Sequence, residues 1–340
     1  NNGALNIRLK AMGDISITNN ADIITKGGDF SVSGANADGD PDTSMTVSDT
    51  AGSFLLNTGS EINTTGGSGV AGGAVTIKTS TRSTSVSPTT DGDIEIKGNI
   101  TTSGGTASGA GLAGGAVILN AGLDSAGNTA GTIEIFTGAD ITTSGSAAAT
   151  SSGGAGAAAG TVTFDTNGET IVLNDTTITA IAGAEDGGGA SASGGTITFS
   201  DNVSIATNGV TLTTGSTGGN IDFSGTIDGS TTLSLTSGTG TIGLSGIVGG
   251  GTNLTGLTIS SSALTIDNNI SVAGDVSITA PVTLGGNVTI DTNTAGTDGD
   301  IDFSSTINGG FNLTLDSGDA NVDIAGAIGT TGTGIGNLDI

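Results

Sequence analysis

The stretch GGNIDFSGTIDG, residues 218–229, returns as DGDIDFSSTINGG at residues 298–310. The likeness continues beyond it, because Leu233 falls on Leu313 and Ile242 falls on Val322 at the same interval of eighty residues. Only small polar residues differ between the two copies, whereas the apolar residues keep their alternating positions. This alternation predicts short β-strands with one buried face.

A shorter unit underlies the long repeat. Triplets of the form apolar-x-apolar begin at Ile221, Ile242, Leu264, Val282, Ile301 and Val322, at intervals of 18 to 22 residues. A unit of about 20 residues that holds two or three short strands is typical of one turn of a β-solenoid. We therefore predict an all-β fold, a right-handed parallel β-helix with about 20 residues per turn and four turns in each eighty-residue repeat.

A recurring pentad suggests how each strand begins. Gly followed by Asp or Asn precedes an apolar-x-apolar triplet at residues 13–17, 92–96, 219–223, 274–278 and 299–303. We expect the Gly and the Asp or Asn to form the corner through positive φ angles and local hydrogen bonds. Apolar side chains of successive turns then stack at the spacing of about 4.8 Å between parallel strands.

The first half of the chain follows the same pattern with interruptions. Triplets at Val75, Val117, Val162 and Ile197 lie 42, 45 and 35 residues apart, and Gly/Ala/Ser tracts at 64–74, 102–116, 143–160 and 183–196 precede them. We expect these tracts to be loops that leave one edge about every second turn, which gives about 14 turns and a rod of roughly 65 to 70 Å.

The expected domain organisation follows from this pattern. Residues 1–340 form a single continuous solenoid, a piece of a longer chain. Residues 1–200 contain the loop-decorated turns, and residues 201–340 contain the regular turns of the eighty-residue repeat.

Composition and charge exclude several classes of function. The chain has 32 acidic and 6 basic residues, a formal net charge of −26, and no Lys or Arg after Lys97, so we expect no nucleic-acid partner. No apolar run approaches the roughly 18 residues of a membrane span, so we expect no membrane insertion. Without Cys, His, Trp or Tyr, only scattered carboxylates remain for catalysis, and we do not expect an enzyme.

Two motifs match ligand-binding patterns only superficially. GSGVAG at 67–72 and GAGLAG at 109–114 fit the dinucleotide fingerprint G-x-G-x-x-G. That fingerprint requires a strand before it and a helix after it, whereas here each tract leads into a strand. We interpret both as parts of the repeated loop.

The candidate metal ligands are Asp38, Asp40 and Asp42 in NADGDPDTS. Their alternate spacing is that of a Ca²⁺ loop, but the Gly and the distal Glu of an EF-hand are missing, so a solvated acidic turn is the alternative interpretation. Asp298, Asp300 and Asp302 are weaker candidates, because the pentad accounts for them. No other cofactor is expected.

Threonines flank an inward residue at 177–179, 196–198 and 211–213. Such pairs could build the flat threonine array of an ice-binding solenoid. Threonine is also an ordinary residue for the outer face of a strand, and these pairs do not recur at every turn of the sequence.

The runs GDISITNNADI (13–23) and NNISVAGDVSITAPVTLGGNVTIDT (268–292) resemble the repeat regions of large bacterial exoproteins of the filamentous haemagglutinin type, which use two-partner secretion. The resemblance implies a β-helix outside the outer membrane, an extracellular protein at the bacterial cell surface that serves as an adhesin shaft or a surface filament.

These observations lead to one main hypothesis, a structural extracellular rod without catalysis. Its partners are expected to be a host or neighbouring cell surface, through a glycan or protein receptor, or further copies joined end to end or side by side. Two alternatives stay open, a carbohydrate- or Ca²⁺-binding solenoid module and an ice-binding solenoid.

Overall fold

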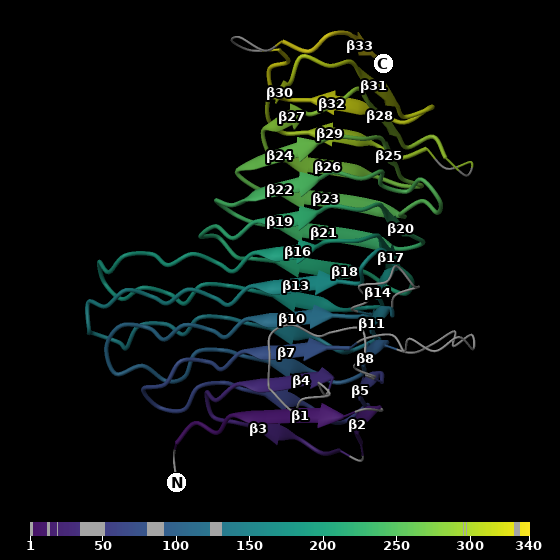
Figure 1. The fold of residues 1–340 in the computed structure, drawn as a ribbon. Helices are drawn as coiled ribbons and strands as arrows, with labels where there is room; N and C mark the ends of the chain where they lie inside the picture. Colours follow the sequence, from purple (N-terminus) through teal and green to yellow (C-terminus); the bar gives the residue numbers. More distant parts are fainter. Residues whose placement is uncertain are drawn as a thin grey trace, which may run out of the picture.

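The protein is a parallel β-helix, as the sequence pattern predicts (Figure 1). The computed structural model describes residues 3–11, 14–18, 20–34, 52–79, 92–122, 131–294, 296, 298–329 and 334–340. Within these residues every regular element is a β-strand, and every strand pairs in parallel with the strands of neighbouring turns. The chain therefore winds as one coil with three flat faces, here named A, B and C in the order in which each turn visits them.

The strands of the three faces have the following bounds. Face A contains β1 (Ile7–Ala11), β4 (Phe30–Gly34), β7 (Val75–Lys78), β10 (Val117–Asn120), β13 (Val162–Asp165), β16 (Ile197–Phe199), β19 (Ile221–Phe223), β22 (Thr241–Leu244), β24 (Ala263–Ile266), β27 (Val282–Leu284) and β30 (Ile307–Asn308). Face B contains β2 (Ile15–Ile17), β5 (Phe54–Leu56), β8 (Ile94–Ile96), β11 (Ile133–Ile135), β14 (Ile171–Leu173), β17 (Val203–Ile205), β20 (Ile227–Gly229), β25 (Ile270–Ser271), β28 (Val288–Asp291), β31 (Leu313–Asp316) and β33 (Leu338–Asp339). Face C contains β3 (Ile23–Ile24), β6 (Ile62–Asn63), β9 (Ile100–Thr101), β12 (Ile141–Thr142), β15 (Thr177–Thr179), β18 (Val210–Thr213), β21 (Thr232–Thr236), β23 (Gly256–Ser260), β26 (Val276–Thr279), β29 (Ile301–Phe303) and β32 (Val322–Ile324).

The described residues form eleven complete turns, because faces A and C each contain 11 strands. At about 4.8 Å per turn the first and last of these turns lie roughly 50 Å apart. The expectation of about 14 turns is therefore wrong. Val117 pairs with Val75 on one side and with Val162 on the other, so each of these long intervals is a single turn enlarged by its loops, not two turns.

The eighty-residue repeat does not correspond to four whole turns. Ile221 lies in a face A column with Ile242, Leu264 and Val282, as the triplet spacing predicts. The next residue in that column is Ile307 rather than Ile301, which pairs with Val276 on face C. Ile301 therefore lies one face short of four full turns after Ile221. The same strand sequence serves on either face because each strand needs only alternating inward and outward side chains.

The core consists of stacked columns of apolar side chains. Phe164, Phe199 and Phe223 stack with ring centroids 4.8 and 4.7 Å apart and are at most 2% exposed. The Ile, Val and Leu residues of the other columns are buried in the same way. Because each inward side chain lies directly over its equivalent one turn below, every turn is supported mainly by its neighbours.

The Asp or Asn residue before a strand connects two turns. The side chain of Asp93 accepts a hydrogen bond of 2.7 Å from the Thr132 N–H, and Asn220 accepts one of 3.1 Å from the Thr241 N–H, in each case one turn further along. No described Asp or Asn of the pentads has a positive φ. The expected role in a local corner is therefore wrong for these residues: they extend the hydrogen-bonded ladder beyond the end of the strand.

Glycine of the pentad serves mainly the close approach of successive turns. Gly92 has the expected left-handed conformation, with a φ of 97°. Gly219, in contrast, lacks a positive φ, and a Cβ atom at this position would lie 2.3 Å from the carbonyl oxygen of Gly195 in the turn below. A side chain there would force the two backbones apart.

The loops of the first half stack on one another to form a fin. We use this name for residues 65–72, 103–114, 144–159 and 181–194, which project from the corner between face C and the next face A strand (Figure 1). None of these residues belongs to a strand, yet backbone hydrogen bonds connect each loop to the next, for example from Gly66 N–H to Ser103 O at 3.0 Å. They leave at four successive turns, after β6, β9, β12 and β15, not at every second turn.

Buried threonines close the loops at this corner, both in the fin and beyond it. The Thr64, Thr143 and Thr214 hydroxyls donate hydrogen bonds of 2.6, 2.6 and 2.7 Å to the carbonyl oxygens of Gly73, Gly160 and Gly219, each the second residue before a face A strand. All three threonines are 0% exposed. The Thr and the Gly of each such hydrogen bond are between 5 and 17 residues apart in the sequence. Loops of very different length are therefore closed at the same corner.

The phenylalanine stack gives a direct test of the column architecture. We expect Phe199→Ala to lower the free energy of unfolding by about 3 to 5 kcal/mol, because it leaves a cavity between two rings. The outward substitution Thr198→Ala on the same strand changes it by about 0.5 kcal/mol or less. Urea unfolding followed by circular dichroism measures both, and amide hydrogen exchange locates the loss to the turns of β13, β16 and β19. Equal effects of the two substitutions contradict the stack.

Candidate functional site

The sequence-predicted metal ligands Asp38, Asp40 and Asp42 lie outside the described residues. The weaker candidates are described, and they separate into different structural roles. Asp298 Oδ2 accepts a hydrogen bond of 2.8 Å from the Asp319 N–H, and Asp300 Oδ1 accepts one of 2.9 Å from the Asn321 N–H. Asp302 points outward on face C. Among the described residues no group of three or more His, Cys, Asp or Glu side chains is placed to hold a metal ion.

Parallel stacking brings acidic side chains into pairs on adjacent turns. Glu95 pairs with Glu134 on face B, and Asp302 pairs with Asp323 on face C. Lys97 lies beside the first pair, with its Nζ 2.6 Å from Glu95 Oε2 and 4.4 Å from the ring centroid of Phe136. Each pair follows from the register of the ladder and lies on a flat outer face.

Glu134 is the acidic residue with the most distinctive surroundings. Burial against its strand neighbours raises the pKa of this carboxyl group, although Asn174 Nδ2 donates a hydrogen bond of 2.9 Å to Oε1 and opposes the shift. Burial also raises the pKa of Asp222 on face A. Glu134 lies beside Glu95, Lys97 and Asn174, and Asp222 pairs with Thr198 in the ladder of face A.

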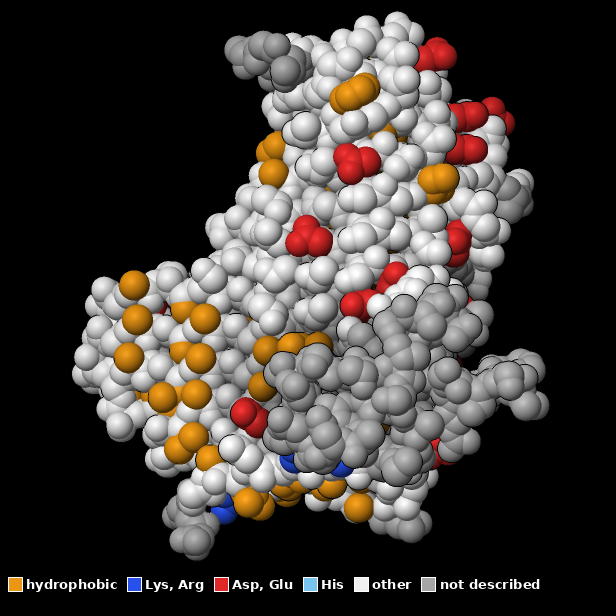
Figure 2. Space-filling view, viewed as in Figure 1, with side chains coloured by type: hydrophobic (Ala, Val, Ile, Leu, Met, Phe, Trp, Pro, Cys, Tyr) orange, Lys and Arg blue, Asp and Glu red, His pale blue; other side chains and the backbone are white. Residues whose placement is uncertain are grey.

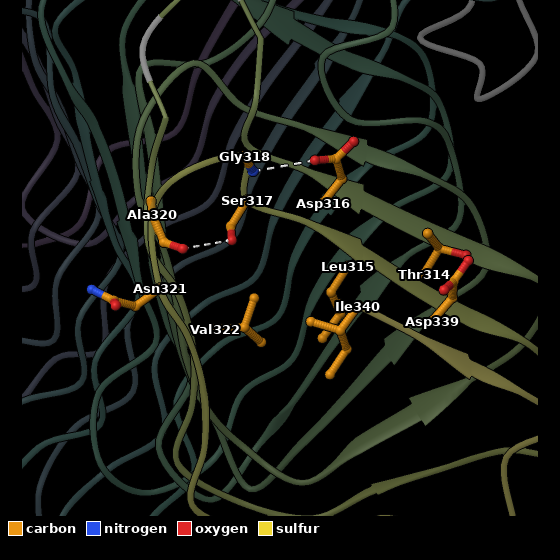
Figure 3. A pocket seen from close by; sticks show the side chains of 10 residues that line it. All are labelled: Thr314, Leu315, Asp316, Ser317, Gly318, Ala320, Asn321, Val322, Asp339 and Ile340. Atoms are coloured by element: carbon orange, nitrogen blue, oxygen red, sulfur yellow. Dashed lines mark hydrogen bonds between the residues drawn. The ribbon is translucent and has the colours of Figure 1, made fainter.

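A hollow of about 530 Å³ opens at the C-terminal end of the coil (Figure 3). Leu315 and Val322, both in core columns, contribute its apolar part, and Ile340 lies beside Leu315. The Ser317 hydroxyl donates a hydrogen bond of 3.0 Å to the Ala320 carbonyl and closes the adjoining turn. Because Leu338 pairs with Leu313, the hollow lies where the final strand β33 covers the turn that contains β31.

A second hollow, of about 490 Å³, lies on the fin and is lined by Gly, Ala, Ser and Thr residues of 104–107 and 146–150. On the visible face of the fin, apolar side chains stand as separate small groups in rows (Figure 2). Ala71, Ala113 and Ala158 are exposed residues of the fin and follow one another from turn to turn through the hydrogen bonds of their loops. Both G-x-G-x-x-G tracts belong to this fin, which agrees with their interpretation as repeated loop.

The outer face of sheet C contains a regular set of hydroxyl groups, and this is the most distinctive surface of the protein. In each turn, one outward residue stands on each side of the inward column that contains Ile178, Leu212, Leu235, Ile259 and Ile278. In five successive turns all of them are Thr or Ser: Thr177 and Thr179, Thr211 and Thr213, Ser234 and Thr236, Thr258 and Ser260, Ser277 and Thr279. We name these ten residues the hydroxyl array.

The sequence revealed only part of this array. Of the three predicted threonine pairs, 177–179 and 211–213 stack directly on face C, whereas 196–198 lies on face A. Pairs of two threonines occupy only two of the five rows, so they do not recur at every turn, and Ser takes the place of one Thr in the other three rows. Intervals of 34, 23, 24 and 19 residues between rows hid the pattern in the sequence.

No protein-family model, curated protein or solved structure matches this chain. The resemblance to exoproteins of the filamentous haemagglutinin type therefore stays a prediction from the sequence. Among the described residues, no helix has the length and apolar character that a membrane crossing requires.

The raised pKa of Glu134 predicts a specific dependence of stability on pH. A carboxyl group whose pKa is higher in the folded state lowers stability as the pH rises through that pKa, because burial opposes ionisation. We expect Glu134→Gln to raise the free energy of unfolding at pH 7 and to leave it unchanged at pH 3. Urea unfolding at both pH values measures the effect.

The matched control is Glu185→Gln, which removes the same charge from an exposed position on the fin. It measures how much the free energy of unfolding rises merely because the net charge of −26 is reduced by one. If the two substitutions raise stability equally at pH 7, burial of Glu134 has no specific effect.

Proposed function

We propose that this chain is a stiff structural segment of an extracellular bacterial protein, the shaft of an adhesin or a surface filament. One observation carries the proposal: the parallel ladder is continuous on face A through all eleven turns, with no domain boundary in the described residues. A ladder of this kind holds its two ends at a fixed separation. The function is then mechanical, to keep another part of the molecule at a distance from the cell.

The way in which the turns are connected supports resistance to force. Each turn is joined to the next by strands on its faces, by side chains of Asp or Asn before strands, and by stacked core residues. A force along the coil axis must break these contacts turn by turn, because each turn contacts mainly its neighbours. Extension therefore proceeds by loss of one turn at a time from an end.

The fin supports a second structural role, contact with neighbouring molecules along the side of the rod. It enlarges the first half of the coil with a surface of Gly, Ala, Ser and Thr. The extracellular location rests on the sequence resemblance. The receptor at the end of such a rod, a glycan or a protein, belongs to the same proposal.

Single-molecule pulling tests the mechanical role. We expect a series of force peaks with two classes of spacing, roughly 60 to 90 Å for turns of 18 to 25 residues and roughly 120 to 160 Å for loop-bearing turns of 35 to 45 residues. Phe199→Ala lowers the peaks of the central turns, and Thr198→Ala leaves them unchanged. A smooth extension without peaks would remove the basis for a load-bearing role.

Location is tested with antibodies raised against the purified chain. Labelling of intact cells of the source organism supports the proposal, and labelling only after the cells are permeabilised contradicts it.

A further inference from the structure

We propose that the hydroxyl array on face C is an ice-binding surface. This inference goes beyond the structural role above, because it assigns a ligand to one particular face of the coil. It rests on four properties of the array: its repetition in two dimensions, its chemistry, its rigidity and the availability of its hydroxyl groups.

The array repeats in two directions. Rows follow one another at about 4.8 Å along the coil axis, and the two residues of a row lie about 6.6 Å apart, twice the rise per residue of a parallel strand. A small molecule contacts one or two rows and gains nothing from five. A ligand that contacts every row equally must repeat at matching intervals, which is the property of a crystal face.

The chemistry of the array selects the kind of crystal. A hydroxyl group donates one hydrogen bond and accepts two, and so it can replace a water molecule in a hydrogen-bonded lattice. None of the ten side chains is charged, in a chain with a net charge of −26. Acidic residues border the array, with Asp140 in the turn below Thr177, Asp302 in the turn above Ser277, and the exposed Asp275 two residues before Ser277. A neutral surface of hydroxyl groups fits solid water and does not fit a charged mineral or a basic protein.

The array is held in a fixed geometry. The inward residues between its two columns, Ile178, Leu212, Leu235, Ile259 and Ile278, are all 0% exposed and fix the strands to the core. Every row contains at least one Thr, whose branched side chain has restricted χ1 rotation. Little conformational freedom is therefore lost when the surface binds an ordered partner.

The hydroxyl groups are available for a ligand. Within the described structure, Thr213 is the only member of the array whose side chain forms a hydrogen bond, accepted from the Gly215 N–H at 3.2 Å. Thr211, Thr258 and Thr279 are exposed, and the other seven residues are partly exposed. The buried loop-closing threonines differ in this respect, because their hydroxyl groups are fully used inside the coil.

Ice growth in the presence of the purified chain tests the proposal. We expect the chain to separate the freezing from the melting temperature, to give faceted crystals and to inhibit ice recrystallisation. Thr236→Tyr places a large side chain in the central row and should reduce the difference between the two temperatures at least fivefold. Thr283→Tyr, an outward substitution on the face A strand β27, is the matched control and should retain it.

Circular dichroism and hydrogen exchange establish that both variants are folded. Absence of any effect of the parent chain on ice growth overturns the proposal, and so does equal activity of the two variants. Partition of the fluorescently labelled chain into a growing ice front gives an independent readout. We expect the parent chain and Thr283→Tyr to enter the ice and Thr236→Tyr to be excluded from it. Binding of the chain to insoluble cellulose or chitin that Thr236→Tyr abolishes, without an effect on ice, would assign the array to a polysaccharide and also overturn the proposal.

Discussion

Hydrogen bonds between the backbones of successive turns determine the architecture of this protein. A short parallel strand has no partner within its own turn, so its N–H and C=O groups are satisfied only by the turns above and below. This constraint places equivalent residues over one another and creates columns, such as the stack of Phe164, Phe199 and Phe223. The core, the outer faces and the fin all follow from the same vertical spacing.

The same constraint explains which parts of the fold could be predicted. Alternation of apolar and polar residues gave the strands, and Ile221, Ile242, Leu264 and Val282 stack as their spacing predicts. The number of turns was overestimated because it was inferred from the number of residues between triplets. A long interval can still be one turn, because a loop adds residues without adding a strand. The second copy of the repeat at Ile301 occupies another face for the same reason.

Side-chain roles at corners were harder to predict. The sequence marks Asp93 and Asn220 as corner residues, but a hydrogen bond to a residue 39 or 21 positions later has no local signal. Buried loop-closing threonines such as Thr143 also look like ordinary polar residues in the sequence. Each of these threonines can be recognised only together with its partner, the Gly two residues before the next strand of face A. The hydroxyl array was found in part, because its rows became neighbours only when the loops between them were placed.

Rigidity connects the proposed shaft to the proposed ice-binding face. A rod that transmits force requires turns that do not slide, and a surface that matches a lattice requires columns that do not shift. Both requirements are met by apolar residues locked beneath the outer face, such as Leu235 and Ile259. The two roles are separable, since substitutions on face C alter the array without removing the core columns.

Cysteine cross-linking tests the register of the coil most directly, because the natural chain contains no Cys. Thr283 pairs with Asn308 on face A, and adjacent strands place their Cα atoms about 4.8 Å apart, within the range of a disulfide. We predict that Thr283→Cys with Asn308→Cys forms a disulfide under mild oxidation and that Thr283→Cys with Asp302→Cys does not. Ser277→Cys with Asp302→Cys shows that position 302 can react. A preferred link between positions 283 and 302 would contradict the register and the three-faced coil built on it.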